Sequence, residues 1–353
     1  MLYDAIVVGA GPSGAIVGEK IAREGFDVLI IEKAESPGQN KICGGAISQN
    51  CFKDLRLPEK IIEKKGFGIT LNFIDEKKFL RGSGFVIVER EIFDDLLVKK
   101  AVDKDAELLT STTVFDVVKN KKSVKVRFRK NQKNQKKEVS AKFVVFADGT
   151  NTLAYSKFNI GYKAEPNSTA LALAYNLEWR NNPYDSLEFF FSENISPFGY
   201  GWIFPKKDSI NIGVLCLLSK IEKNLNKYLN AFIDSLKLQK LKRISFGARL
   251  IPQSIPKKIF VDSVLVVGDA AGTADPITGG GISNAIENGK VAAKIVLNSL
   301  SKNISKASLF EYNEKWQQSP TFMRLQKNYQ LQKITLNQNI IPGFLLNELG
   351  FFN

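Results

Sequence analysis

A glycine-rich turn between a short apolar strand and a helix constrains this chain more than any other feature. Residues 3–8 (Tyr-Asp-Ala-Ile-Val-Val) predict a strand, and Gly9-Ala-Gly-Pro-Ser-Gly14 follows it directly. A helix is expected next, and a second apolar strand over residues 28–31 is closed by Glu32, 18 residues after Gly14. Strand, turn, helix and strand in this order form a βαβ unit, which predicts a Rossmann-type dinucleotide site.

Each residue of the turn has a distinct physical task in such a site. Gly9 permits the tight turn, Gly11 lets the backbone approach a pyrophosphate, and Gly14 lets the helix pack closely on the strand. The N–H groups at the start of the helix then face the phosphates. Glu32 can accept the hydroxyls of the adenosine ribose. A chance glycine-rich turn is the alternative, and the flanking strand, helix and acid argue against it.

A second motif places a carboxylate directly after another buried strand. Val264-Leu-Val-Val-Gly-Asp269 is followed by Gly279-Gly-Gly281 and then by an expected helix, whose N-terminus can stabilise negative charge on a reduced flavin. The two motifs lie about 255 residues apart, which favours one FAD spanning the domain over an NAD site. Asp148-Gly149 and Arg90 are weak signals alone and gain weight in this order.

Composition excludes several classes of function. The chain has 353 residues and three scattered cysteines but no histidine, which excludes a His-based catalytic triad and argues against a disulfide framework or a metal site. No apolar run is long enough to span a membrane, and no signal peptide is recognisable, so a cytoplasmic enzyme is expected. The net charge of +14 is either a Lys-rich compositional bias or an attraction to an anionic lipid surface or an acidic electron-donor protein; no motif for nucleic acid accompanies it.

The remaining pattern predicts an α/β fold with two interleaved domains. Strands are expected over 67–88, with a break at Gly82–Gly84, and β-sheet again over 168–216, while helices are expected over 221–240, 282–299 and 307–340. We therefore expect a Rossmann-like FAD-binding domain interleaved with an α+β substrate domain built on an antiparallel sheet, followed by a helical C-terminal region. The FAD-binding domain is predicted to comprise residues 1–66, 89–165 and 256–300, the substrate domain 67–88 and 166–255, and the helical region 301–353.

Three segments resemble a known group of flavoproteins. They are Lys41-Ile-Cys-Gly-Gly-Ala46, Pro197-Phe-Gly-Tyr-Gly-Trp-Ile-Phe-Pro205, and Asp269-Ala-Ala-Gly with Asp275-Pro276 and Thr278-Gly-Gly-Gly-Ile282. Over roughly residues 1–300 the chain resembles the para-hydroxybenzoate-hydroxylase-type FAD superfamily and, within it, the geranylgeranyl reductase family. The Tyr-x-Trp-x-Phe-Pro stretch is the most specific piece.

The resemblance implies a set of flavin contacts. Carried over by motif, the contacts would be Ser13, Glu32, Cys43, Gly44, Ala46, Arg90, Val114, Asp269, Gly281 and Ile282, in addition to Gly9, Gly11 and Gly14. Ala46 departs from the glycine often found at its position, and a small side chain should still fit there.

The resemblance also implies an activity, the saturation of isolated carbon–carbon double bonds in isoprenoid chains by hydride from reduced flavin. Tyr200, Trp202 and Phe204 would line the substrate pocket, where their rings could tolerate positive charge by cation–π attraction, worth about 0.5–2 kcal/mol per ring. Their alternative role is packing on one face of a sheet. Cys43, Tyr200 and Trp202 are the predicted catalytic residues. For Cys43 the alternative is an inert thiol.

Several questions stay open at this level. An archaeal-type ether phospholipid is the expected substrate, with reduced ferredoxin or NADPH as the electron donor. A flavin monooxygenase or halogenase of the same fold, and a flavin-binding electron-carrier module without enzymatic activity, are the alternatives. The apolar segment 340–352 and the positive charge suggest peripheral contact with an anionic membrane, on the inner face of the cell membrane.

Overall fold

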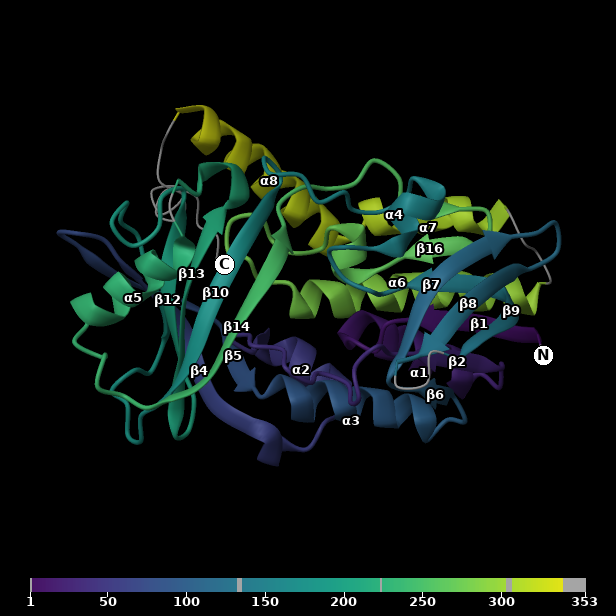
Figure 1. Ribbon diagram of the computed structural model, residues 1–353, viewed down its shortest axis with the longest axis horizontal. Coiled ribbons are helices and arrows are strands. Elements are labelled where there is room, and N and C mark those ends of the chain that lie inside the picture. Colours follow the sequence, from purple (N-terminus) through teal and green to yellow (C-terminus); the bar gives the residue numbers. More distant parts are fainter. Residues whose placement is uncertain (1, 132–134, 223, 303–306, 339–353) are drawn as a thin grey trace. The chain divides into compact units, whose positions relative to one another are not determined.

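The computed structural model describes residues 2–131, 135–222, 224–302 and 307–338 (Figure 1). The described chain forms two compact units, each assembled from separated segments. Unit 1 comprises residues 1–39, 91–164 and 252–327, and unit 2 comprises residues 40–90, 165–251 and 328–353. The predicted segment 340–352 lies outside the described residues.

Unit 1 is built on a mainly parallel sheet with strand order β15-β16-β9-β1-β2-β6. The pairings β1–β2, β1–β9, β9–β16 and β2–β6 are parallel, and an antiparallel ribbon of β7 and β8 joins the first half of β9. The strands are β1 (Leu2–Val8), β2 (Val28–Ile31), β6 (Glu107–Leu109), β7 (Thr112–Lys119), β8 (Val124–Lys130), β9 (Lys136–Phe146), β15 (Phe260–Val261) and β16 (Val264–Val266).

Helices cover this sheet, which explains why β2 and β16 are apolar throughout rather than alternating. All four residues of β2 and all three of β16 are buried, as expected for parallel strands covered on both faces. Helices α1 (Pro12–Arg23) and α6 (Ile282–Ser301) pack against each other, and α7 (Ala307–Gln317) packs on α6 (Figure 1). The other helices are α3 (Arg90–Val102), α4 (Leu153–Phe158) and α8 (Pro320–Gln338), which continues into unit 2.

Unit 2 is built on a sheet with strand order β14-β10-β13-β12-β11-β4-β5-β3. The pairing β11–β4 is parallel, and β10–β13, β13–β12, β12–β11, β4–β5 and β5–β3 are antiparallel. The strands are β3 (Ala46–Ser48), β4 (Ile62–Asn72), β5 (Lys77–Val88), β10 (Thr169–Glu178), β11 (Leu187–Phe190), β12 (Gly199–Pro205), β13 (Ser209–Leu217) and β14 (Arg243–Pro252).

One face of the unit 2 sheet carries its aliphatic core. Ile203, Ile212 and Val214 point to this face and are fully buried beneath α5 (Leu225–Ser235), whose Leu229 and Phe232 complete the cluster. The short helix α2 (Gln49–Leu55) packs on β5, and Ser48 caps its N-terminus by accepting a hydrogen bond from the backbone N–H of Cys51. The opposite face of the sheet is therefore left to the side chains that alternate with this core.

The predicted fold class is confirmed, and the structure differs from the sequence-based expectation in four segments. Residues 40–66 belong to unit 2 because β3 and β4 pair with β5, and residues 301–327 belong to unit 1 because α7 packs on α6. The predicted break at Gly82–Gly84 lies inside β5, and the chain reverses between β4 and β5 at residues 73–76. The helix expected over 221–240 is limited to Leu225–Ser235.

Candidate functional site: a flavin site and an aromatic sheet face

Two glycines of the turn in unit 1, Gly9 and Gly14, have no room for a side chain. Gly9 has a φ of +103°, and a Cβ there would lie less than 3.0 Å from the carbonyl oxygen of Ala147. A Cβ on Gly14 would lie less than 3.0 Å from the carbonyl oxygen of Gly9. Two backbone segments therefore meet at the carboxyl ends of β1 and β9, where the predicted pyrophosphate site lies.

The start of α1 presents unsatisfied donors beside this turn. Gly11 is the N-cap residue, and no side chain accepts a hydrogen bond from the first turn of the helix. The free N–H groups and the positive end of the helix dipole suit a phosphate group. Ser13 lies in the same turn and is buried.

Glu32 is fixed at the end of β2 by two backbone donors. Its carboxylate accepts hydrogen bonds from the N–H groups of Ala10 at 2.8 Å and Ala34 at 2.9 Å. A carboxylate has about four acceptor positions, so capacity remains for ribose hydroxyls. The backbone carbonyl of Glu32 accepts from the N–H of Thr112, which places β7, and with it Val114 two residues further along, beside this end of the sheet.

The second motif meets the first inside unit 1. A Cβ on Gly268 would lie 2.5 Å from the hydroxyl oxygen of Ser13, so the turn before Asp269 packs directly on the start of α1. On the other side, Asp269 lies beside Gly281: a Cβ on Gly281 would be 3.3 Å from the Asp269 carboxylate. Gly281 is the N-cap of α6, Ile282 is its first residue, and no side chain caps this helix either. Ser13, Asp269 and Gly281 are thus brought together, although they are distant in the sequence.

Sequence reasoning missed the residues that hold this second turn. Asn288 is fully buried on α6, and its side-chain oxygen accepts a hydrogen bond from the N–H of Gly268 at 3.0 Å. Its amide nitrogen donates to the Tyr312 hydroxyl at 3.0 Å, and that hydroxyl donates to the carbonyl of Val266 at 2.8 Å. Complete burial raises the pKa of Tyr312 well above its ordinary value. The signal in the sequence was an asparagine on the buried face of a predicted helix.

The loop that leads to Gly281 is organised in the same way by Asp275. Its side-chain oxygen accepts hydrogen bonds from the N–H groups of Ile277 and Thr278, both at 3.0 Å. The carbonyl of Asp275 accepts from the N–H of Gly279 at 2.8 Å. This turn presents the N-terminus of α6 as a preformed surface.

Asp148 holds a buried carboxylate at the end of β9. One oxygen accepts a hydrogen bond from the N–H of Leu153 at 2.8 Å, whereas the other, Oδ1, is buried without a hydrogen-bond partner. Burial raises the pKa of Asp148 to about 6. A buried polar atom without a partner, next to the tightly packed glycine turn, is consistent with a site that a polar ligand completes.

In unit 2 the Cys-Gly-Gly segment lies against the aromatic strand. A Cβ on Gly44 would lie less than 3.0 Å from the ring of Phe204, so that ring packs directly on the Gly44 backbone. Gly45 has a φ of +72°, and its carbonyl accepts a hydrogen bond from the backbone N–H of Val88 of β5. Cys43 is half-buried, and its sulfur accepts a hydrogen bond from the N–H of Gly45 at 3.4 Å. The thiol proton of Cys43 therefore remains available for donation.

Aromatic side chains line the face of the unit 2 sheet opposite α5. Tyr200, Trp202 and Phe204 alternate along β12, and their neighbouring rings lie 6.1 and 6.5 Å apart between centroids, which confirms that they share one face. Phe189 of β11 contacts Tyr200 and Phe204 edge to face, at 5.3 and 5.5 Å. The ring of Phe191 lies tilted against Tyr200, with 6.0 Å between the centroids. The result is a continuous aromatic wall beside Gly44.

The predicted site residues therefore form two groups, one in each unit. In unit 1 the structure brings together the glycine turn, Ser13, Asp269, Gly281 and Ile282, with Glu32 and Val114 at the ends of neighbouring strands. In unit 2 it brings together Cys43, Gly44 and the aromatic residues, and it places Ala46 as the first residue of β3 and Arg90 as the first residue of α3.

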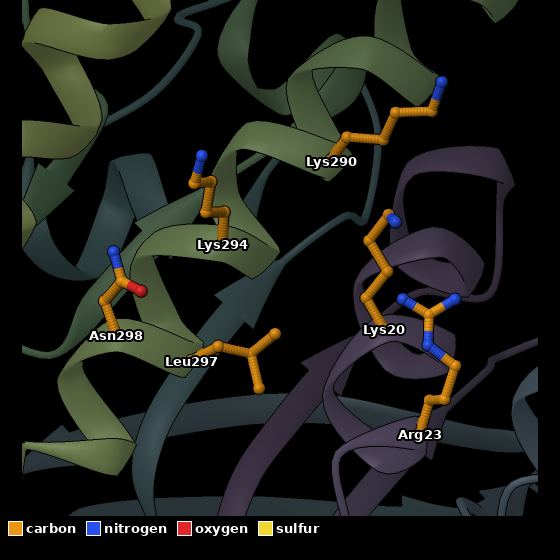
Figure 2. A pocket seen from close by; sticks show the side chains of 6 residues that line it. All are labelled: Lys20, Arg23, Lys290, Lys294, Leu297 and Asn298. Carbon is orange, nitrogen blue, oxygen red and sulfur yellow. The ribbon is translucent and has the colours of Figure 1, made fainter.

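A separate cleft between α1 and α6 has a volume of ≈ 360 Å³ and a basic lining (Figure 2). Lys20, Arg23, Lys290, Lys294, Leu297 and Asn298 line it. Arg23 forms ion pairs with Glu19 at 3.3 Å and Glu24 at 3.7 Å, and Lys290 pairs with Glu287 at 2.6 Å. Cations in the last turn of α1 also stabilise the helix dipole, so we assign this cleft no ligand.

Among the described residues, no cluster of His, Cys, Asp or Glu could hold a metal ion, and no described helix is long and apolar enough to cross a membrane. The donor set of unit 1 instead fits a dinucleotide. It combines two uncapped helix N-termini, glycines that admit a close ligand, and carboxylates at two strand ends.

Comparison with known proteins agrees with this description. A family model described as an FAD binding domain matches residues 2–182, and one described as a geranylgeranyl reductase catalytic domain matches residues 167–249. These matches and the unit 1 site define an FAD-dependent oxidoreductase. The digeranylgeranylglycerophospholipid reductase of Methanococcus vannielii is 31% identical over 328 residues, covering 90% of this chain and 82% of that protein. This chain belongs to the geranylgeranyl reductase family.

Three further comparisons agree with this family and fold. The digeranylgeranylglycerophospholipid reductase of Methanocaldococcus jannaschii is 31% identical over 333 residues, covering 90% of this chain and 83% of that protein. The crystal structure of a geranylgeranyl bacteriochlorophyll reductase-like protein from Thermoplasma acidophilum superposes with a TM-score of 0.84 at 26% identity, covering 96% of this chain and 90% of that one. A flavin-dependent brominase, at a TM-score of 0.79 and 21% identity, shares the fold.

Proposed function

We propose that this chain saturates isolated carbon–carbon double bonds in the geranylgeranyl chains of archaeal-type ether phospholipids. The observation that carries the proposal is the aromatic wall of Tyr200, Trp202 and Phe204 beside Gly44. Aromatic rings suit an apolar alkene, which offers no carbonyl to polarise. The names of the relatives in Methanococcus vannielii and Methanocaldococcus jannaschii support the same substrate class.

The residues of unit 1 would bind and orient the cofactor. The N-terminus of α1 and the glycine turn would hold the pyrophosphate, Glu32 the ribose, and Asp269 the ribityl chain, while the N-terminus of α6 would stabilise negative charge on the flavin ring. Bound FAD in its reduced form supplies the hydride. Ser13 and Arg90 complete the contacts that the family resemblance implies.

The residues of unit 2 would handle the alkene and the proton. The aromatic wall would exclude water and would stabilise the positive charge that develops on the substituted carbon when the other alkene carbon is protonated, by about 0.5–2 kcal/mol per ring. Cys43 would donate its thiol proton to the less substituted alkene carbon, because its sulfur accepts from Gly45 and keeps the S–H for donation. Hydride from reduced FAD would go to the substituted carbon, and solvent would return a proton to the Cys43 thiolate. We therefore expect Cys43→Ser to keep FAD bound and to slow alkene reduction. Unchanged turnover in this variant would remove Cys43 from the mechanism.

The reaction itself can be measured directly. Purified enzyme with chemically reduced FAD should add two hydrogens per double bond to a digeranylgeranyl glycerophospholipid, and mass spectrometry resolves each addition. Geranylgeranyl diphosphate serves as the comparison substrate without the ether lipid. Oxygen consumption coupled to oxidation or halogenation of a substrate would overturn the proposal in favour of a monooxygenase or halogenase, and a bound flavin without turnover would favour an electron carrier.

The electron donor and the membrane are part of the same proposal. A net charge of +14 favours an acidic partner, so we propose reduced ferredoxin as the donor, with NADPH as the comparison in the same assay. The charge also favours peripheral contact with an anionic membrane surface. Co-sedimentation with anionic vesicles should fall as salt rises, and equal recovery with neutral vesicles would contradict this contact.

A further inference from the structure

A chain of side-chain hydrogen bonds crosses four neighbouring strands of unit 2 and ends on Trp202. The indole N–H of Trp202 donates to the side-chain oxygen of Asn211 at 2.8 Å, and the amide of Asn211 donates to the oxygen of Asn176 at 2.8 Å. The amide of Asn176 then donates to the hydroxyl of Ser245 at 3.0 Å. The four residues belong to β12, β13, β10 and β14, which are consecutive in the sheet.

The direction of every bond in this chain follows from the indole. An indole N–H can only donate, so Asn211 must present its oxygen to Trp202 and its NH₂ group to Asn176. Asn176 must in turn present its oxygen to Asn211 and its NH₂ group to Ser245. One donor at the aromatic end thus fixes the rotation of both amides, and the two amides fix the position of the indole.

The backbone beneath the indole is shaped for this arrangement. Gly213 of β13 lies directly across from Trp202, and a Cβ there would lie less than 3.0 Å from the six-membered ring of the indole. The indole therefore lies flat over the glycine and reaches Asn211, which is paired with Phe204 one step along the same face. Trp202 is 8% exposed and Asn211 is fully buried.

Packing alone does not require such a chain. Replacing both partners of a buried hydrogen bond by apolar groups of similar shape is nearly neutral for stability, whereas leaving one partner unsatisfied is costly. A Phe and a Leu at positions 202 and 211 would fill the same space. What the hydrogen bonds add is a single orientation of the Trp202 ring within the aromatic wall.

We propose that Asn211 and Asn176 are positioning residues, which hold the Trp202 indole in the one orientation that aligns the prenyl chain for reduction. The proposal rests on the proposed function in one respect, the identity of the aligned chain. The orientation itself is a property of the protein and can be measured without substrate.

The first measurement follows the indole directly. The chain has three tryptophans, so Trp179→Phe and Trp316→Phe assign the remaining ¹⁵N–¹H indole resonance to Trp202 in the FAD-loaded enzyme. Asn211→Leu should move this resonance to the position of an unbonded indole and increase its hydrogen-exchange rate at least tenfold. Asn176→Ala, which leaves the first bond in place and removes its support, should give an intermediate shift. An unmoved resonance in Asn211→Leu overturns the proposal.

Ser196→Ala is the matched control. The Ser196 hydroxyl is buried and donates to the backbone carbonyl of Leu215 at 2.6 Å, on the same sheet but outside the chain. It therefore removes a buried hydrogen bond of unit 2 without touching Trp202. Its indole resonance should match that of the parent protein.

The second measurement follows the reaction. Asn211→Leu should lower kcat/KM for a digeranylgeranyl glycerophospholipid on the order of tenfold and change the order in which the double bonds are saturated, while FAD content and the flavin spectrum stay unchanged. Asn176→Ala should do the same to a smaller extent, and Ser196→Ala should do neither. A shifted indole with kinetics and products within twofold of the parent would overturn the positioning role.

If the parent enzyme reduces no prenyl lipid, the proposed function fails, and the indole resonance still decides whether Asn211 holds Trp202. Asn176→Ala serves both measurements if Asn211→Leu does not fold, because Asn176 is only half-buried.

Discussion

The candidate sites on the two sheets of this protein differ in the atoms that form them, backbone in unit 1 and side chains in unit 2. In unit 1 the proposed cofactor site is mostly backbone: glycines that admit a close approach, and the N-termini of α1 and α6. In unit 2 the site is formed by side chains, a wall of rings whose orientation depends on their neighbours. The cofactor site is therefore sensitive to added volume, whereas the aromatic site is sensitive to lost or altered contacts.

The largest effect is expected from Gly14→Val in unit 1. The new side chain would overlap the carbonyl of Gly9 and separate α1 from β1, so FAD binding should be abolished. Absorbance at the flavin bands of the purified protein measures this. Gly25→Ala is the control, because nothing lies within 4 Å of a Cβ there, and it should stay yellow.

Retained flavin in Gly14→Val would break the comparison, because it would mean that close backbone packing is not what forms the cofactor site. Gly25 has a φ of +82°, so its alanine variant should still lose about 1 kcal/mol of stability. The two variants therefore separate the effect of backbone strain from the effect of lost packing between α1 and β1.

Asn288→Leu should have the next largest effect, and it tests whether the buried asparagine supports the turn before Asp269 in unit 1. It leaves the buried N–H of Gly268 without its side-chain partner, and it removes one of the two hydrogen bonds of the Tyr312 hydroxyl, which still donates to the carbonyl of Val266. We expect the free energy of unfolding to fall by about 2–4 kcal/mol and the affinity for FAD to fall with it. Chemical denaturation and flavin titration measure the two effects.

The control for Asn288→Leu lies on the same helix. Ser299 is buried and donates only to the carbonyl of Ile295, one turn earlier on α6. Ser299→Ala should cost little stability and leave FAD affinity unchanged. Equal losses of FAD affinity in both variants would show that α6 acts as a whole, without a specific role for Asn288.

Asp148→Asn removes a carboxylate of unit 1 whose negative charge is destabilised by burial. The pKa of Asp148 is raised from an ordinary 3.8 to about 6, so its proton is bound more tightly in the folded state. Its contribution to stability is therefore full below about pH 4 and is lost as the pH rises through 6, by about 2–3 kcal/mol. Relative to the parent, the flavin-free Asn variant should gain stability between pH 4 and pH 7, measured by denaturation at each pH.

Glu138 is the control, because its pKa is shifted in the opposite direction to that of Asp148. Hydrogen bonds from Lys125 and Arg127 lower the pKa of this exposed carboxylate, so any contribution it makes is lost as the pH falls. Glu138→Gln should therefore show no gain between pH 4 and pH 7. The same gain in both variants would contradict the assignment to Asp148.

Gly44→Ala should have the smallest effect of the four and tests the side-chain site. The added methyl group meets the ring of Phe204, which can rotate away, unlike the backbone carbonyl that faces Gly14. We expect a loss of about 1–2 kcal/mol in stability and a severalfold loss of turnover. Phe204→Leu in the same chain should restore stability but not turnover, and restored turnover would mean that the Phe204 ring is not part of the pocket.

Local patterns made unit 1 predictable from the sequence. Gly9, Gly14 and Glu32 lie within one βαβ unit, and their roles follow from spacing alone. The shared face of Tyr200, Trp202 and Phe204 followed equally from the alternation of side chains along one strand.

What could not be predicted depends on pairing between distant strands. Residues 40–66 were assigned to the cofactor domain, but β4 pairs with β5 and β11, and no local pattern encodes that partner choice. Asn176, Asn211 and Ser245 look like ordinary polar residues of separate strands until the register aligns them. Asn288 finds Tyr312 only because α7 folds back on α6.

The bond between Asn288 and Tyr312 has a consequence for synthesis on the ribosome. The first βαβ unit emerges early, but the turn before Asp269 gains its full support only when α7 has left the exit tunnel and Tyr312 reaches Asn288. A nascent chain that stops before α7 would carry the whole glycine motif and still lack this brace. The cofactor should therefore bind late, after α7 has left the ribosome.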